Sequence, residues 1–154
     1  MKNSSKPARR GQALGATEEA AFLELLRTTD TLSRGLIPVL KSEDVSPNQY
    51  NVLRILRGAP EGLACGEIAS RMITRDPDVT RLLDRLEKRQ LISRCRESED
   101  RRTVRTRISP EGLGLLARLD KPVLTAHRNL LGHLGQKRLR SLSALLREAR
   151  SQVT

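Results

Sequence analysis

Aliphatic side chains recur every three or four positions along most of this chain, and this spacing constrains the fold more than any other feature. The sequence has one Phe, one Tyr and no Trp, so it lacks the aromatic residues that usually enrich β-strands. A chain of 154 residues is long enough for one compact domain with a core and short for two. The pattern therefore predicts a mainly helical fold that acts as one unit.

Two helices are expected in the first part of the chain. The first extends from Thr17 to about residue 41, with Pro38 as a kink or an end. Residues 46–49 (SPNQ) form a capping box with proline at the first helical position, so a second helix begins there and runs to about Arg57. The apolar positions of the first helix are Phe22, Leu25, Leu26, Leu32, Leu36, Val39 and Leu40.

Two further helices joined by a tight turn are expected next. A short third helix spans about 66–72, has a weak cap, and is followed by a turn at 73–76. In the fourth helix Asp76 is the expected N-cap and Pro77 the first helical residue, and the helix reaches about Arg89. The residues expected to be buried in the third helix are Ile68, Ala69 and Met72.

The fourth helix has one apolar face and one basic face when its residues are placed at 100° intervals. An apolar stripe with an Arg-rich outer face is the polarity of a recognition helix, which enters the major groove of duplex DNA. The stripe consists of Val79, Leu82, Leu83 and Leu86, and the outer face of Pro77, Thr80, Arg81, Asp84, Arg85 and Lys88.

Two strands around a charged turn are expected after the fourth helix, at 91–97 and 103–109, and apolar and polar residues alternate in the second of them. Ser109 and Pro110 then open a helix that continues toward Leu134, and a last helix follows Gly135. This order of elements is a helix-turn-helix followed by a β-hairpin wing. The fold class is therefore mainly α with a small β-hairpin, a winged helix-turn-helix with flanking helices.

The charge balance points to an anionic polymer as partner. Lys and Arg outnumber Asp and Glu by 29 to 18, which gives a formal net charge of +11. Duplex DNA is favoured over single strands, whose binding sites usually stack bases on aromatic side chains. A membrane partner is not expected, because no apolar run approaches about 20 residues. Residues 1–15 lack the apolar middle of a secretory signal, so a cytoplasmic protein is expected.

Neither a metal nor a cofactor is expected, and the pattern does not indicate an enzyme. Cys65 and Cys95 form no CxxC motif, and His127 and His133 are too far apart to share a helix face as i, i+4 ligands would. No Ser/His/Asp grouping, Gly-rich phosphate loop or convergent carboxylate pair is visible.

Three motifs together resemble the MarR family of winged helix-turn-helix regulators. Residues 77–89 (PDVTRLLDRLEKR), followed by Leu91, Ile92 and Arg94, resemble the family's recognition helix and first wing strand. Residues 100–102 (DRR) resemble its wing-tip motif, and residues 109–112 (SPEG) resemble the start of the helix after the wing. Gln90 and Ile73 depart from the family, which usually has Gly at both positions, and Arg75-Asp76 replace the more usual Ser-Arg.

The resemblance implies roles for individual residues. Thr80, Arg81 and Arg85 would face the major groove, and Arg101 and Arg102 would approach the minor groove or its phosphates. Asp100 would pair with Arg102 to shape the wing. Asp84 is expected to orient a basic neighbour on its own helix, or a wing Arg. The full set of expected DNA contacts is Arg75, Pro77, Asp78, Thr80, Arg81, Arg85, Lys88, Arg101, Arg102 and Arg105.

The resemblance also implies a homodimer that binds a pseudo-palindromic operator, represses transcription, and is released by a small-molecule effector, often an aromatic acid in this family. The polar and basic composition of residues 1–16 predicts a disordered tail there, and the regulator domain would occupy 17–152. Within that domain, the DNA-binding lobe would span about 42–109, and the dimerisation helices about 17–41 and 110–152. The expected dimer contacts are Phe22, Leu25, Leu26, Leu139, Leu142, Leu145 and Leu146.

Two alternative functions remain open from the sequence. A winged-helix adaptor would use the same helix face to bind another protein. A thiol-based redox sensor would use Cys65 or Cys95. Arg94 and Arg96 flank Cys95, which favours a thiolate, but side chains next to each other on a strand point to opposite faces, so both Arg lead away from the sulfur. The redox alternative is therefore disfavoured.

Overall fold

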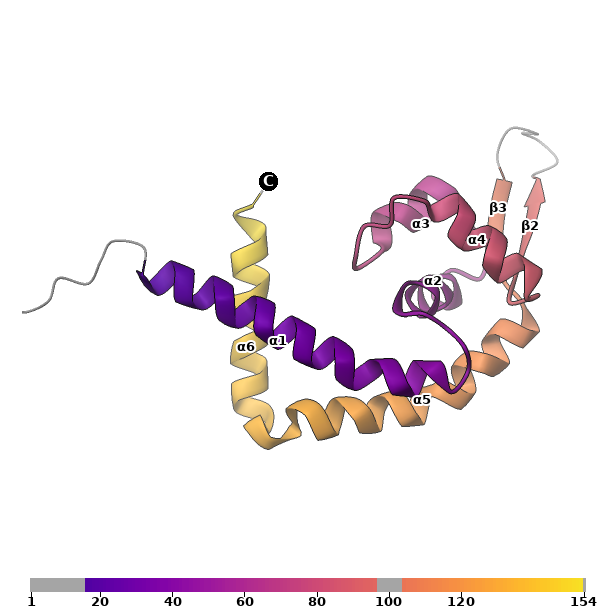
Figure 1. Cartoon of the computed structure of the whole chain (residues 1–154). Helices are drawn as coiled ribbons and strands as arrows, with labels where there is room; N and C mark the ends of the chain where they lie inside the picture. Colours follow the sequence, from indigo (N-terminus) through magenta and orange to yellow (C-terminus); the bar gives the residue numbers. More distant parts are fainter. Residues whose placement is uncertain (1–15, 97–103, 154) are drawn as a thin grey trace, which may run out of the picture. The chain divides into compact units, whose positions relative to one another are not determined.

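The computed structural model describes residues 16–96 and 104–153. These fall into two compact units, one up to Ser33 and one from Arg34 onward, and helix α1 belongs to both. The elements shown in Figure 1 are α1 (Ala16–Lys41), α2 (Pro47–Arg57), β1 (Leu63–Ala64), α3 (Cys65–Arg71), α4 (Val79–Lys88), β2 (Ile92–Arg96), β3 (Val104–Ile108), α5 (Pro110–Leu131), a short 3₁₀ helix η1 (Gly132–Leu134) and α6 (Gly135–Ser151). The expected mainly helical fold with a small antiparallel sheet is confirmed.

Helix α1 begins one residue earlier than expected, at Ala16, and continues past Pro38 to Lys41. Residues 1–15, which make up nearly all of the expected basic tail, lie outside the described residues. Between Ala16 and Ser33 no side chain of α1 is fully buried, and Leu32 is half-buried. Among the described helices, none combines the length and the apolar character that a bilayer span requires.

The hydrophobic core lies in the second unit. It includes the last turn of α1 and residues of α2, α3, α4 and α5. Burying each of these aliphatic side chains stabilises the fold by roughly 1.5–3 kcal/mol. The largest fully buried apolar side chains are Leu40, Leu53, Leu56, Ile68, Leu83, Leu86, Leu116 and Leu119.

The caps of α2 and α3 follow from their sequences. The Ser46 hydroxyl accepts a hydrogen bond from the Gln49 backbone, and the Gln49 side chain accepts one from the Ser46 backbone, so the expected capping box is confirmed. Ala64 has no side-chain cap to offer α3, but Glu67 accepts a hydrogen bond from its backbone at 2.7 Å. In α3 the prediction for Ala69 was wrong: it is exposed, because it points away from the core that buries its neighbour Ile68.

The sheet has three antiparallel strands in the order β1-β3-β2. Ile92 of β2 lies opposite Ile108 of β3, and Leu63 of β1 lies opposite Thr106. Strand β1 was not expected from the sequence, since two residues are too short for an alternating pattern. Gly62 precedes it with φ +88°, a left-handed conformation that glycine adopts without strain.

A close junction joins the end of α4 to the start of α5. Gln90 follows α4 with φ +59°, so it adopts the left-handed conformation, which is one of the two ways in which a helix can end at a residue other than glycine. Its carbonyl accepts a hydrogen bond from the Ser109 hydroxyl at 2.6 Å, and that hydroxyl accepts one from the Gly112 backbone at 3.0 Å. A side chain at Gly112 would collide with the Leu91 carbonyl.

Ion pairs fasten α5 to the segments that pack on it. Arg118 of α5 donates two hydrogen bonds to the Glu43 carboxylate at 2.8 Å, which lower the pKa of Glu43 below its ordinary value. Arg57 of α2 likewise donates to both oxygens of Asp120. Arg89, just after α4, donates to the backbone carbonyls of Glu43 and Asp44. The lobe that carries α4 is therefore tied to α5 at several points.

Candidate nucleic-acid interface

Helix α4 begins two residues later than the sequence predicted. Asp78, and not Asp76, is its N-cap: the Asp78 carboxylate accepts a hydrogen bond from the Arg81 backbone at 2.9 Å. Pro77 therefore precedes the helix, which starts at Val79 and ends at Lys88. The expected inner face is confirmed, since Leu82, Leu83 and Leu86 are buried and Val79 is half-buried.

The turn before α4 is held by α2. Asn51 of α2 accepts a hydrogen bond from the Ile73 backbone at 2.9 Å, and Asn48 donates one to the Asp76 carboxylate at 2.8 Å. The other oxygen of Asp76 accepts from the backbone of Asp78 at 2.9 Å. This backbone hydrogen bond, the contribution of Asn48 and the positive charge of Arg85 lower the pKa of Asp76, so it stays ionised at neutral pH. Asp76 thus organises the turn that leads into the helix.

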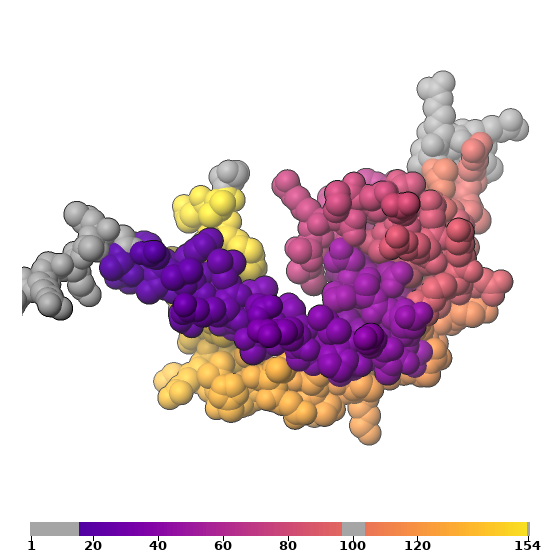
Figure 2. Space-filling view, viewed as in Figure 1, coloured from indigo at the N-terminus to yellow at the C-terminus, as the bar shows by residue number. Residues whose placement is uncertain are grey.

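The outer face of α4 is open and basic. Figure 2 shows the surface of the segment from α3 to β2 on the viewed face of the molecule. Within residues 16–96 and 104–153, the side chains of Arg81 and Lys88 make no hydrogen bond or ion pair, so their charges are available to a ligand. The expected DNA contacts of the turn and α4, all exposed, are Arg75, Pro77, Asp78, Thr80, Arg81, Arg85 and Lys88.

The two acidic residues of α4 are bound by one arginine of the sheet. Arg94 of β2 donates from Nε to Glu87 at 2.9 Å, and its Nη2 pairs with both Asp84 and Glu87. Its guanidinium is half-buried, and the hydrogen bonds of Glu87 are the main cause that raises the pKa of Arg94. Of the two roles expected for Asp84, the structure shows pairing with a wing Arg.

The wing consists of β2, β3 and the segment between them; the two strands pair in the sheet seen in Figure 1, and β2 packs against α4. Asp100, Arg101 and Arg102 lie outside the described residues. Arg105 of β3 is half-buried; it donates to the Gly62 carbonyl at 3.1 Å and lies 3.7 Å from Glu67. Arg107 is exposed and donates to the Glu61 carbonyl. The two arginines therefore also hold the loop before β1 against the sheet.

The two cysteines lie in different surroundings. Cys65, the first residue of α3, is partly buried, and its Sγ lies 4.0 Å from the hydroxyl of Thr80 on α4. Cys95 on β2 is exposed. In the part of the chain that the structure describes, no three His, Cys, Asp or Glu residues are grouped so that they could hold a metal ion.

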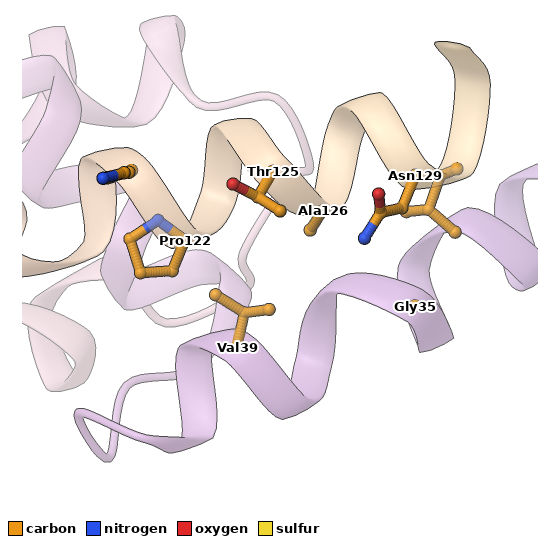
Figure 3. Close-up of a pocket in the computed structure, with 8 residues that line it drawn as sticks. Gly35, Val39, Pro122, Thr125, Ala126 and Asn129 are labelled. Atoms are coloured by element: carbon orange, nitrogen blue, oxygen red, sulfur yellow. The ribbon is translucent and has the colours of Figure 1, made fainter. Parts of the chain in front are cut away.

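A pocket of about 510 Å³ lies between α5 and the last two turns of α1, within the second unit. Figure 3 shows Pro122, Thr125, Ala126 and Asn129 along α5, facing Gly35 and Val39 of α1. Lys121 also lines the pocket. The wall is mostly apolar, with an ammonium, a hydroxyl and an amide as its polar groups.

The leucine stripes of the terminal helices are left largely uncovered in the single chain. Phe22 of α1 is 61% exposed and Leu145 of α6 is 63% exposed. Leu25 and Leu26 are exposed, whereas Leu139, Leu142 and Leu146 are half-buried, and no residue of α6 is fully buried. Large apolar faces of this kind usually mark an interface.

Sequence reasoning missed the residues that position the candidate interface. Arg94 was noted as part of a motif and as a neighbour of Cys95 but was not assigned a positioning role, and the supporting roles of Asn48 and Asn51 were not expected. Each of them bonds to a segment distant in sequence, and such pairings leave no periodic signal. The available hints for Arg94 were a charged residue inside an expected strand and the expectation that Asp84 could pair with a wing Arg.

Comparison with known proteins shows what this chain is similar to. The MarR family profile matches residues 45–104. A MarR transcription factor from Planctomyces limnophilus, known from its crystal structure, is 38% identical, with 84% of this chain and 94% of that one covered and a TM-score of 0.67. The transcriptional repressor CouR, solved bound to a 23-mer DNA duplex, is 28% identical over 94% of this chain and 99% of its own, with a TM-score of 0.71. The regulator PecS of Dickeya dadantii (strain 3937) is 27% identical over 79% of this chain and 75% of PecS.

Proposed function

This chain belongs to the MarR family of transcriptional regulators, which bind DNA, and we propose that it binds a pseudo-palindromic operator in duplex DNA as a homodimer. The observation that carries the proposal is the outer face of α4. Among residues 16–96 and 104–153, the side chains of Arg81 and Lys88 have no ion-pair partner, while Asp84 and Glu87 of the same helix are bound by Arg94. A basic helix face whose own acidic residues are bound by another side chain is suited to the negatively charged major groove.

The outer face of α4 reads the bases, whereas residues near the two ends of that helix bind phosphates and the wing approaches the minor groove. Thr80, Arg81 and Arg85 face the base edges, where an Arg that binds a guanine with two hydrogen bonds discriminates against other bases by roughly 1–3 kcal/mol. Arg75 and Lys88 bind phosphates at the two ends of the helix, and Pro77 and Asp78 lie at its start. Arg101, Arg102 and Arg105 of the wing approach the adjacent minor groove, with Asp100 shaping the turn.

The regulator acts as a repressor with no catalytic activity of its own. The repressor CouR, whose structure includes a DNA duplex, supports this sign of regulation. Release from the operator is controlled by a small aromatic carboxylate that binds the pocket between α1 and α5. Lys121 supplies a positive charge for the carboxylate, and Val39, Pro122 and Ala126 supply apolar surface for the ring.

The test is selection of bound sequences from random duplex DNA, followed by affinity measurements on the enriched sequence at several salt concentrations. We expect an inverted repeat whose half-sites are centred about 10 base pairs apart. We also expect affinity to fall steeply with salt, because each neutralised phosphate releases counterions. The Arg81→Ala variant should lose discrimination between operator and random DNA by about 1–3 kcal/mol. Benzoate-type acids, added to the same assay, should weaken operator binding by the wild-type protein.

The opposite results would separate this proposal from its alternatives. Selection that enriches no sequence, together with weak binding that changes little with salt, would favour a protein-interaction adaptor. Enrichment of a single half-site would contradict the dimer. An operator affinity that no carboxylic acid changes would remove the effector from the proposal and leave the DNA-binding function intact.

A further inference from the structure

We propose that Arg94 is a positioning residue for base reading: by binding Asp84 and Glu87 it keeps the Asp84 carboxylate away from Arg81 and Lys88, which stay free to bind the operator. This inference rests on the proposed function. Arg94 itself is half-buried on β2, inside the joint between the sheet and α4, so it acts through its neighbours.

The spacing along α4 makes Asp84 a natural partner for the base-reading residues. Asp84 follows Arg81 by three positions and precedes Lys88 by four, and side chains at these spacings lie next to each other on a helix surface. An unbound carboxylate at this position would therefore pair with one of them. It would also face the phosphates of bound DNA, which repel it.

The structure shows which pairing prevails. Arg94 bonds to both acids of α4 through its planar fork, with Nε on Glu87 at 2.9 Å and Nη2 shared between Asp84 and Glu87. A rigid fork that binds two carboxylates in a half-buried site loses less side-chain entropy per bond than an exposed pair on a helix. In agreement, Arg81 and Lys88 have no ion pair within the described residues.

Glu87 makes this arrangement specific for arginine. The carboxylates of Asp84 and Glu87 lie one helical turn apart and converge on a single guanidinium. A lysine at the same place is a point charge without the fork, so it would hold the two carboxylates less firmly. The Arg94→Lys variant therefore preserves the positive charge but loses the planar guanidinium that binds both carboxylates.

The experiment compares the affinity for the selected operator with that for random duplex DNA in Arg94→Met, Asp84→Asn and the double variant. The ratio of the two affinities is informative, because a change in net charge alters both affinities in the same direction and largely cancels. In Arg94→Met the Asp84 carboxylate loses its partner and should form an ion pair with Arg81 or Lys88. The ratio of operator affinity to random-DNA affinity should then fall about tenfold, which is within the discrimination of one base contact. Adding Asp84→Asn should restore the ratio to within about threefold of wild type, since no competing carboxylate remains at that position.

Arg107→Met is the matched control. Arg107 lies on the neighbouring strand and bonds to the Glu61 backbone carbonyl, so its loss removes one positive charge without freeing an acid of α4. Both affinities should fall in this variant and their ratio should stay unchanged. Thermal unfolding followed by circular dichroism establishes that each variant is folded. If Arg94→Met does not fold, Arg94→Lys replaces it, and the ratio of its two affinities should fall below that of wild type, because lysine holds the two carboxylates less firmly.

Each remaining outcome has one meaning. An unchanged ratio in a folded Arg94 variant, or a ratio that Asp84→Asn does not restore, overturns the proposal. Failure of both Arg94 variants to fold would make Arg94 a stabilising residue only, and would also overturn it. If the wild-type protein itself does not discriminate between operator and random DNA, the proposed function fails first.

Discussion

At the scale of single residues, Gly112 sets how closely α5 approaches the end of α4. A Cβ built on Gly112 would lie 2.8 Å from Cγ1 of Ile108 and closer still to the Leu91 carbonyl oxygen. Backbone atoms cannot move aside as the end of a flexible side chain can. The glycine in the SPEG motif is therefore explained by close packing, and the adjacent Ser109 bonds to the Gln90 carbonyl at the same junction.

Gly112→Ala should destabilise the protein, whereas Gly114→Ala should stabilise it. Both substitutions introduce a better helix-forming residue into α5, which by itself favours folding by roughly 0.4–1 kcal/mol. At Gly114 the nearest neighbour of an added Cβ is an Arg118 nitrogen at 3.6 Å, which is ordinary contact. At Gly112 the overpacking costs roughly 1–3 kcal/mol and outweighs the gain. Urea unfolding of the two variants measures this, and equal stabilisation of both would contradict the close packing.

Gln90 shows what could be predicted for a residue and what could not. Its place after the apolar stripe of α4 required either a left-handed conformation or another helix ending, and the structure has the first, with φ +59°. The hydrogen bond from Ser109 to its carbonyl was not predictable, because it joins positions separated by the whole wing. For Gln90, the local sequence limits the backbone conformation, but it does not identify the hydrogen-bond partner from a distant part of the chain.

At the scale of elements, the helices with a clear apolar period were predicted to within a few residues, but the N-cap residue of α4 was predicted wrongly. Asp76 and Asp78 both suit an N-cap, and the proline between them favoured Asp76 by the rule for the first helical position. In the structure Asp76 is held by Asn48 of α2, 28 positions away, so Asp78 caps the helix. Strand β1 was missed for a similar reason, since only its pairing with β3 defines it.

The Asp78→Ala variant should lower the free energy of unfolding by about 1 kcal/mol, because the Arg81 backbone N–H loses its acceptor. Asp78→Ser should stay within a few tenths of a kcal/mol of wild type, since Ser is also a good N-cap. Both are measured by thermal unfolding without DNA, so that a role of Asp78 in DNA contact does not enter. If Asp78→Ala leaves the free energy of unfolding unchanged, Asp76 and not Asp78 would be the functional N-cap of α4.

At the scale of the whole molecule, the sequence showed which surfaces are apolar without showing what covers them. Leucine stripes in α1 and α6 fit an ordinary core as well as an interface, and only their exposure in the folded chain separates the two. The wing-tip residues 100–102 lie outside the described residues, so their expected contacts with DNA stay predictions. The apolar faces of α1 and α6 are where the proposed homodimer is most directly testable.

We expect the wild-type protein to sediment as a dimer and the Phe22→Asp, Leu145→Asp double variant as a monomer. Both residues are more than half exposed in the single chain, and burying two carboxylates in an apolar interface opposes association strongly. Ile73→Asp is the control, because Ile73 is 87% exposed in the turn before α4 and belongs to neither terminal helix, so this variant should stay a dimer. A monomer holds one half-site, so it loses the effective concentration of the second recognition helix, and operator affinity should fall by about 10²-fold or more. If the wild-type protein sediments as a monomer, and if it binds the operator no more tightly than the double variant does, these apolar faces do not form a dimer interface and serve another purpose.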